Sequence, residues 1–191
     1  MDGMRIGIQG DKGSTNERAC FFFATKYGWK NSNIQYLITT ENVLKSLERG
    51  DIQYGTFAWK SSRSGFVAET QKAIQKYSFE KVDEQDFQLD HALLSHSVID
   101  IKRPVIFYSH PQALKEHKIA LQNMFSQCVF REASDTALAA KNLRDGKYEK
   151  NSLVIAPLVC ATLYDLDIFS SNLPSNVGYM TTIYLVKKRT M

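Results

Sequence analysis

Residues 105–114 read Val105-Ile106-Phe107-Tyr108-Ser109-His110-Pro111-Gln112-Ala113-Leu114. The first part is a short apolar run, which predicts a buried strand over residues 105–109. The second part begins a helix, because Pro111 suits a first helical turn, where its missing N–H costs nothing. Ser109 and His110 therefore lie where a strand ends and a helix begins. In open α/β sheets, ligands bind at this edge, beside the free N–H groups of the helix start.

The same alternation continues in both directions along the chain. Short apolar runs predict further strands at residues 5–9, 34–38, 53–59, 127–131, 153–156 and 180–186. Amphipathic stretches between them predict helices at residues 16–27, 41–49, 67–77, 111–125, 135–144 and 157–164. Alternation of this kind indicates an α/β fold with mostly parallel strands.

Composition favours a folded protein of the cytosol. The chain has 191 residues, 43% of them hydrophobic, which is enough for one domain or two small lobes. The net charge is +4, but Lys and Arg are spread among Asp and Glu, so no nucleic-acid partner is expected. No apolar run approaches the ~20 residues that cross a bilayer, so we expect no membrane segment. The three cysteines are widely spaced and no secretory leader precedes Arg5, which favours a reducing, cytoplasmic compartment.

Small polar side chains gather at the predicted helix starts. Ser14 and Asn16 follow a glycine turn, and Ser134 and Thr136 begin the helix at 135–144. For Ser134 and Thr136, helix capping and contact with a ligand carboxylate are both open, and one side chain can do both. His110 has no nearby Asp to orient it, so a structural hydrogen bond is a better interpretation than a general base.

Six segments, in order between Arg5 and Val186, resemble the motifs of the prephenate dehydratase family. Residues 9–19, QGDKGSTNERA, are similar to "Q-G-x-x-G-x-x-S-E-x-A", and residues 105–114 are similar to "v-x-S-H-P-Q-A-L". Residues 133–140 are similar to "n-S-T-x-x-A-A", and residues 154–156 with 163–166 to "a-I-a" followed by "Y-x-L". Residues 50–65, GDIQYGTFAWKSSRSG, are similar to "G-D-x-x-y-g-x-x-P-x-E-N-S-x-x-G", and residues 179–183 occupy the place of "N-x-T-R-F".

The resemblance implies an α/β fold of two lobes, like the type II periplasmic binding proteins. It places the first lobe at about residues 1–81 plus 164–191 and the second at about residues 82–163. It covers the catalytic part of the family, and no segment of this sequence resembles the ACT domain that senses phenylalanine in regulated members. The resemblance also suggests a homodimer.

The resemblance further implies a lyase of aromatic amino acid biosynthesis. Such an enzyme decarboxylates and dehydrates prephenate, a small dicarboxylate, to phenylpyruvate, and needs no metal or organic cofactor. Thr181 occupies the position of the Thr in "T-R-F", which helps the ring hydroxyl to leave. The side chains expected to bind the substrate are Ser14, Asn16, Lys60, Ser61, Ser109, His110, Ser134, Thr136 and Thr182. His91, His96 and His117 have no partners at ligand spacing, so no metal site is predicted.

Two motifs depart from the family pattern. Thr182 replaces the Arg of "T-R-F", which removes a two-pronged donor for a carboxylate. Trp59 and Lys60 replace the Glu and Asn of "E-N-S", whereas Ser61 is retained. Lys60 is either a replacement cation beside the substrate or a solvated loop charge.

These departures leave three functions open. The first is the dehydratase reaction on prephenate or a close relative. The second is decarboxylation without loss of the hydroxyl, which would give a non-aromatic product. The third is a two-lobed protein that binds a small carboxylate without turnover.

Overall fold

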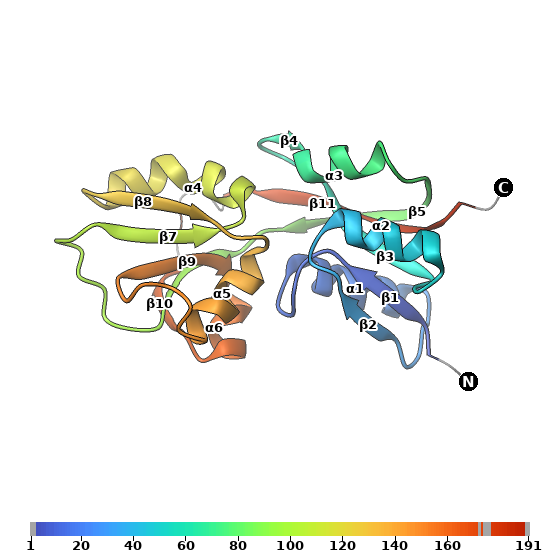
Figure 1. Cartoon of the computed structure of the whole chain (residues 1–191), viewed down its shortest axis with the longest axis horizontal. Helices are drawn as coiled ribbons and strands as arrows, with labels where there is room; N and C mark the ends of the chain where they lie inside the picture. The colour runs from blue at the N-terminus through green and yellow to red at the C-terminus, as the bar shows by residue number, and fades with distance from the viewer. Residues whose placement is uncertain (1–2, 172, 174–176, 190–191) are drawn as a thin grey trace. The chain divides into compact units, whose positions relative to one another are not determined.

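The computed structural model describes residues 3–171, 173 and 177–189, and its chain forms two compact units. Unit 1 contains the described residues up to Gln88 and from Met180 onward, and unit 2 is Leu89–Tyr179 (Figure 1). The boundaries proposed from the sequence, near residues 82 and 164, differ from these. The chain returns to unit 1 only at Met180, because a strand at Asp167–Ser170 pairs within the sheet of unit 2.

Unit 1 is a mixed sheet with helices on both faces. Its elements are β1 (Arg5–Ile8), α1 (Thr15–Lys26), β2 (Asn33–Tyr36), α2 (Thr40–Arg49), β3 (Tyr54–Ser61), β4 (Gly65–Phe66), α3 (Ala68–Ile74), β5 (Phe79–Gln88) and β11 (Met180–Lys188). The strand order is β2-β1-β3-β11-β5, with β4 paired to β3. Ile183 and Leu185 of β11 pack against Phe23 of α1, whereas Val186 packs against Leu47 of α2. Alternate residues of β11 therefore face α1 on one side and α2 with α3 on the other.

Unit 2 is a second mixed sheet. Its elements are β6 (His91–Ser95), β7 (Val105–Ser109), α4 (Pro111–Met124), β8 (Cys128–Glu132), α5 (Thr136–Arg144), β9 (Ser152–Pro157), α6 (Val159–Tyr164) and β10 (Asp167–Ser170), in the strand order β10-β6-β9-β7-β8. One core lies between the sheet and α4, where Leu121 packs against Phe107. Another lies under α5 and α6, where Ala140 and Cys160 pack against Val154.

The prediction of mostly parallel strands is wrong. Parallel pairing joins β1 to β2 and β3, and β7 to β8 and β9, but five pairs among the described strands are antiparallel. Most of these pairs involve β5, β6 or β10, which apolar runs in the sequence did not indicate. The edge strand β5, with the sequence FEKVDEQDFQ, shows why: charged side chains occupy half of its positions, as is common on edge strands.

Side chains cap several of the helix starts. Asp135 caps α5 by accepting a hydrogen bond from the backbone N–H of Leu138, and Thr39 caps α2 in the same way. Pro111 occupies the first turn of α4, as predicted. These caps fix where each helix begins relative to the strand before it.

Replacing Gly55 with alanine is expected to lower the stability of unit 1 by about 1–3 kcal/mol, because a Cβ there overpacks the core. That Cβ would lie 2.5 Å from Cγ1 of Val43 on α2. Chemical denaturation measures the change. The single variant Val43→Ala and the double variant Gly55→Ala/Val43→Ala are the controls, since both lack the methyl group that the new Cβ would meet. If the stability loss of the double variant equals the sum of the losses of the two single variants, the clash is not the cause.

Candidate active site

Thr181 is a buried residue near the start of β11, between two neighbouring strands. Figure 1 shows β11 running beside β3 and β5, and the register pairs Thr181 with Ser61 on β3 and Phe87 on β5. Paired residues of antiparallel strands share a sheet face, with Cβ atoms about 4.5–5.5 Å apart. The pairing with β5 is regular from Met180 to Leu185, so Thr181 points to the face that α1 covers. Its hydroxyl donates to the Lys60 carbonyl over 3.3 Å.

Thr182 and Lys60 point to the opposite face. They are paired in register, and Asp86 of β5 is the other partner of Thr182. The Thr182 hydroxyl donates a hydrogen bond to the Asp86 carboxylate. The structure thus groups Thr181 with Ser61 and Thr182 with Lys60, on different faces of one sheet.

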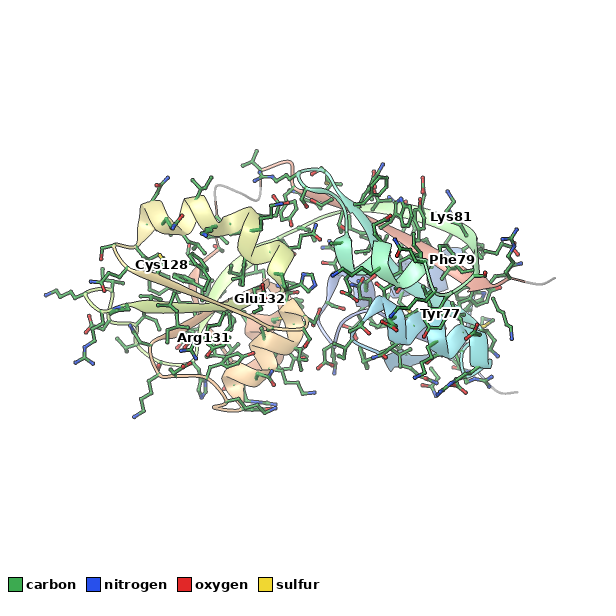
Figure 2. All side chains as sticks on the ribbon, turned by 45° about the horizontal axis from the view of Figure 1, so that its top comes forward. Tyr77, Phe79, Lys81, Cys128, Arg131 and Glu132 are labelled. Atoms are coloured by element: carbon green, nitrogen blue, oxygen red, sulfur yellow. The ribbon has the colours of Figure 1, made fainter. Side chains whose placement is uncertain are left out.

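Trp59 lies at a bulge of β3, where the register with β11 shifts. Its ring stacks on Tyr184 at 4.7 Å and packs edge-on against Phe66, on the face covered by α2 and α3. Figure 2 shows Phe79 and Lys81 where β5 enters this region, and the Lys81 ammonium lies 5.1 Å from the Tyr184 ring centroid. The Trp that replaces a motif Glu is therefore part of an aromatic cluster.

Ser61 organises the turn that follows β3. Its buried hydroxyl accepts hydrogen bonds from the backbone N–H groups of Arg63 (3.2 Å) and Ser64 (3.4 Å). Ser62 then links the turn to β11. Its N–H donates to the Met180 carbonyl, and its hydroxyl accepts from the Met180 N–H. Ser61 therefore holds the loop beside Thr181 in a fixed conformation.

Gln9, at the end of β1, is a buried residue that the sequence analysis did not select. Its Oε1 accepts from the Ala58 N–H (2.8 Å), and its Nε2 donates to the Glu69 carboxylate (3.1 Å). Because the Ala58 N–H can only donate and the Glu69 carboxylate accepts, the two partners identify the oxygen and the nitrogen of the Gln9 amide. The other Glu69 oxygen accepts from the Thr40 N–H at the start of α2 (2.7 Å). In the sequence, the position of Gln9 in the "Q-G" motif was the one feature that could have indicated these hydrogen bonds.

Asn16 and Ser14 lie in the first turn of α1, next to Gln9. Asn16 donates its Nδ2 to Gln9 Oε1 over 3.5 Å, which leaves its Oδ1 buried and without a hydrogen-bond partner among the described residues. Ser14 caps the helix by accepting from the Glu17 N–H. The Gly13 N–H donates to the Glu17 carboxylate, so this turn uses several of its own donors.

Glu69→Ala is expected to destabilise unit 1 by about 1–3 kcal/mol, because it removes the acceptor of both the Gln9 amide and the Thr40 N–H. Urea denaturation followed by tryptophan fluorescence is a direct measurement, since Trp29 and Trp59 both lie in unit 1. Lys72→Ala, on the same helix and exposed, is the matched control. Equal midpoints for the two variants would contradict the proposed link.

In unit 2, two of the residues predicted to bind the substrate make hydrogen bonds to backbone groups. The Ser109 hydroxyl is fully buried and donates to the Ile155 carbonyl (2.6 Å), which ties β7 to β9. His110 caps α4, with Nδ1 accepting from the Gln112 N–H (3.3 Å), in agreement with its structural interpretation. Ser134 is exposed and the cap of α5 is Asp135, while Thr136 is the first helical residue and half-buried.

A buried histidine pair in unit 2 was not foreseen. His91 Nδ1 and His117 Nε2 are 2.9 Å apart, and both rings pack edge-on against Tyr179. Burial lowers the pKa of His91 to about 3, with His117 and His110 acting in the same direction. His91 is therefore neutral at physiological pH, which fits a structural hydrogen bond to His117 inside the core.

The sequence model of one family matches residues 6–190, and that family is described as prephenate dehydratase. The chain belongs to the prephenate dehydratase family. The match covers both units, so the resemblance seen in the motifs extends over nearly the whole sequence.

Known proteins agree with this family and with the two-lobed fold. A bifunctional chorismate mutase/prephenate dehydratase of Buchnera aphidicola is 22% identical over 189 residues, which are 99% of this chain and 48% of that protein. The chain thus spans about half the length of this curated relative. The Arthrobacter aurescens prephenate dehydratase, solved in complex with L-Phe, has a TM-score of 0.77 at 16% identity, over 98% of this chain and 61% of that one. A periplasmic substrate-binding protein of an ABC transporter from Coxiella burnetii has a TM-score of 0.54 at 16% identity, over 97% and 84%. The fold is that of the type II periplasmic binding proteins, as predicted.

The described residues show three further features of this prephenate dehydratase family member. Within residues 3–171, 173 and 177–189, no three His, Cys, Asp or Glu side chains are grouped so that they could hold a metal ion. Burial raises the pKa of the Cys20 thiol to about 12, which makes it a poor nucleophile. None of the helices in the described part of the chain is long and apolar enough to cross a membrane.

Proposed function

We propose that this family member is a lyase that decarboxylates and dehydrates prephenate, or a close relative, to phenylpyruvate. The observation that carries the proposal is the place of Thr181. It occupies the "T-R-F" position, is buried on the α1 face of the unit 1 sheet, and is paired with the motif residue Ser61. At this position the reaction requires one hydroxyl, held on a rigid strand, that can donate a hydrogen bond to the departing ring oxygen.

The chemistry needs few protein groups. The bond from the ring to its carboxylate breaks, and its electron pair completes the aromatic ring as the C–O bond to the ring hydroxyl breaks. Carbon dioxide leaves, and hydroxide leaves as water after taking up one proton from the solvent. The Thr181 hydroxyl, which donates to the Lys60 carbonyl at a long 3.3 Å, would turn its hydrogen bond to the departing oxygen.

The remaining residues are proposed to bind the two carboxylates of the substrate. They are Ser14, Asn16, Lys60, Ser61, Ser109, His110, Ser134, Thr136 and Thr182. Ser14 and Ser109 already make hydrogen bonds to the backbone, so each would act by fixing the helix start or the strand end within its own unit. Ser134 is exposed, and Lys60 is exposed on the sheet face opposite Thr181.

Incubation of the purified chain with prephenate at neutral pH tests the proposal. Phenylpyruvate is followed by its alkaline absorbance, and all products are identified by mass spectrometry against a sample without protein. Formation of phenylpyruvate above that background is the expected result. Its absence, with prephenate otherwise intact, would overturn the proposed reaction.

A second candidate is decarboxylation without loss of the hydroxyl. The observation in its favour is that the Thr181 hydroxyl already has an acceptor in the Lys60 carbonyl, while Thr182 stands in place of the motif Arg. The same experiment separates the two reactions, because this one yields a non-aromatic dihydro-hydroxyphenylpyruvate. Binding of prephenate without any product would instead identify a small-carboxylate-binding protein.

We also propose that the protein acts in the cytoplasm as a homodimer. The support is the family itself, together with the three described cysteines, which form no disulfide and of which Cys20 and Cys160 are buried in apolar clusters. Light scattering coupled to size-exclusion chromatography measures the assembly. A monomer mass at micromolar concentration would contradict the dimer.

A further inference from the structure

We propose that a hollow at the end of α1 is a binding site for a small planar aromatic carboxylate. The hollow has a volume of about 420 Å³ and lies within unit 1, between the last turns of α1 and the loop that leads to β2. Pockets that hold small ligands have volumes of ~300–1,000 Å³. The hollow is therefore large enough for a small organic molecule.

Small residues beside aromatic rings give the hollow its shape. Phe21 and Ala24 line it from α1, and because they are three residues apart they lie on one side of the helix. Gly28 lines it just beyond the helix, where an added Cβ would meet no atom within 4 Å. Trp29 follows and contributes a second aromatic ring. Rings of this kind favour a flat aromatic ligand, which packs against them by stacking or edge-on.

Neighbouring side chains hold Trp29 in place. Its ring stacks on Tyr27, with the centroids 5.2 Å apart, and lies 4.4 Å from the ring of Tyr54. Asp83 of β5 fixes this end of α1, because its carboxylate accepts from the Tyr27 hydroxyl (2.8 Å) and pairs with Lys26 (2.6 Å). A wall that is already ordered lowers the entropic cost of binding a ligand.

Lys30 gives the hollow a positive charge. Its side chain is exposed and makes no ion pair within residues 3–171, 173 and 177–189. The indole N–H of Trp29 likewise has no hydrogen-bond partner in the described part of the chain. The residues that line the hollow include no Asp or Glu. A carboxylate is a group that both of these donors can bind, so an anionic ligand fits the hollow better than a cationic one.

This site is separate from the proposed substrate site. Ser14 and Asn16 lie at the start of α1, whereas the hollow adjoins its last turns. The helix has 12 residues, and at 1.5 Å of rise per residue its two ends are roughly 16 Å apart. The residues that line the hollow also fall between the motifs at 9–19 and 50–65, so none of the residues assigned to the reaction belongs to it.

Titration with 2-naphthoate, followed in proton–nitrogen NMR correlation spectra, tests the proposal. The chain has two tryptophans, Trp29 and Trp59, so two indole N–H signals are expected, and Trp59→Phe assigns them. We expect the Trp29 signal to move to a saturating position while the Trp59 signal stays. A stationary Trp29 signal would overturn the site, and so would equal movements of both signals.

Ala24→Leu should weaken the binding of 2-naphthoate by about tenfold or more, because the larger side chain fills the hollow. The matched control is Ala24→Ser, which leaves the hollow open and should bind like the unchanged chain. The remaining NMR signals show that each variant is folded. An affinity of folded Ala24→Leu equal to that of the wild type would overturn the site.

Lys30→Ala should weaken the binding of 2-naphthoate by about 2- to 5-fold, as is typical of an exposed charge pair. Lys45→Ala removes an exposed lysine of α2 and is the control of equal charge, which should bind like the wild type. Naphthalene-2-carboxamide lacks the negative charge, so it should bind equally to Lys30→Ala and the wild type. Equal losses of 2-naphthoate affinity for Lys30→Ala and Lys45→Ala would overturn the assignment of a carboxylate ligand.

Discussion

Thr181→Ala is expected to lower kcat for prephenate by about 100-fold or more while KM stays near its original value. A hydrogen-bond donor aimed at the charge that develops in the transition state contributes typically ~10²–10³-fold, and its effect is realised only there. Thr181 is held for this role by strands on both sides, since its neighbours in the sheet are Ser61 and Phe87. Steady-state kinetics with the aromatic product as readout measures the effect.

Thr181→Ser is the matched control, because it keeps the hydroxyl and removes only a methyl group. We expect it to retain most of the activity, and thermal unfolding should show that both variants remain folded. A raised KM with unchanged kcat in Thr181→Ala would instead give Thr181 a role in ground-state binding. Unchanged kinetics would remove the catalytic assignment.

Acidification from pH 7 to pH 4 is expected to destabilise unit 2 through the buried His91. The folded-state pKa of about 3 lies below the ordinary value of 6.5, because burial disfavours the charged ring. As the pH falls through 6.5, the unfolded chain binds a proton that the folded chain does not. The free energy of unfolding therefore falls by about 1.4 kcal/mol per pH unit until the pH approaches the folded-state pKa.

Hydrogen exchange of the β6 and β9 amides at pH 7, 6, 5 and 4 measures this loss within unit 2. His91→Gln keeps a polar side chain beside His117 but cannot titrate, so its stability should depend less steeply on pH. The control is His96→Gln, which replaces an exposed histidine just beyond the same strand. Parallel pH profiles for His91→Gln and the wild type would show that His91 is not the source of the acid sensitivity.

Local signals in the sequence were enough for much of the fold. The apolar run at 105–109 and Pro111 predicted β7 and the start of α4. Side-chain period and helix capping depend on residues within a few positions of each other, so they can be recognised without the tertiary structure. The charged strand β5 escaped detection because an edge strand needs few apolar residues.

The sequence by itself determined the family, through ordered motifs, and the succession of most strands and helices. Only the tertiary structure decided which side chains share a face: the register of β11 separates Thr181 and Ser61 from Thr182 and Lys60. It also joined Gln9 to Glu69, 60 residues apart, and paired His91 with His117 in a core. Strand register and burial arise from contacts between distant segments, and a shift of one residue would turn every side chain to the other face. No local pattern in the chain carries that information.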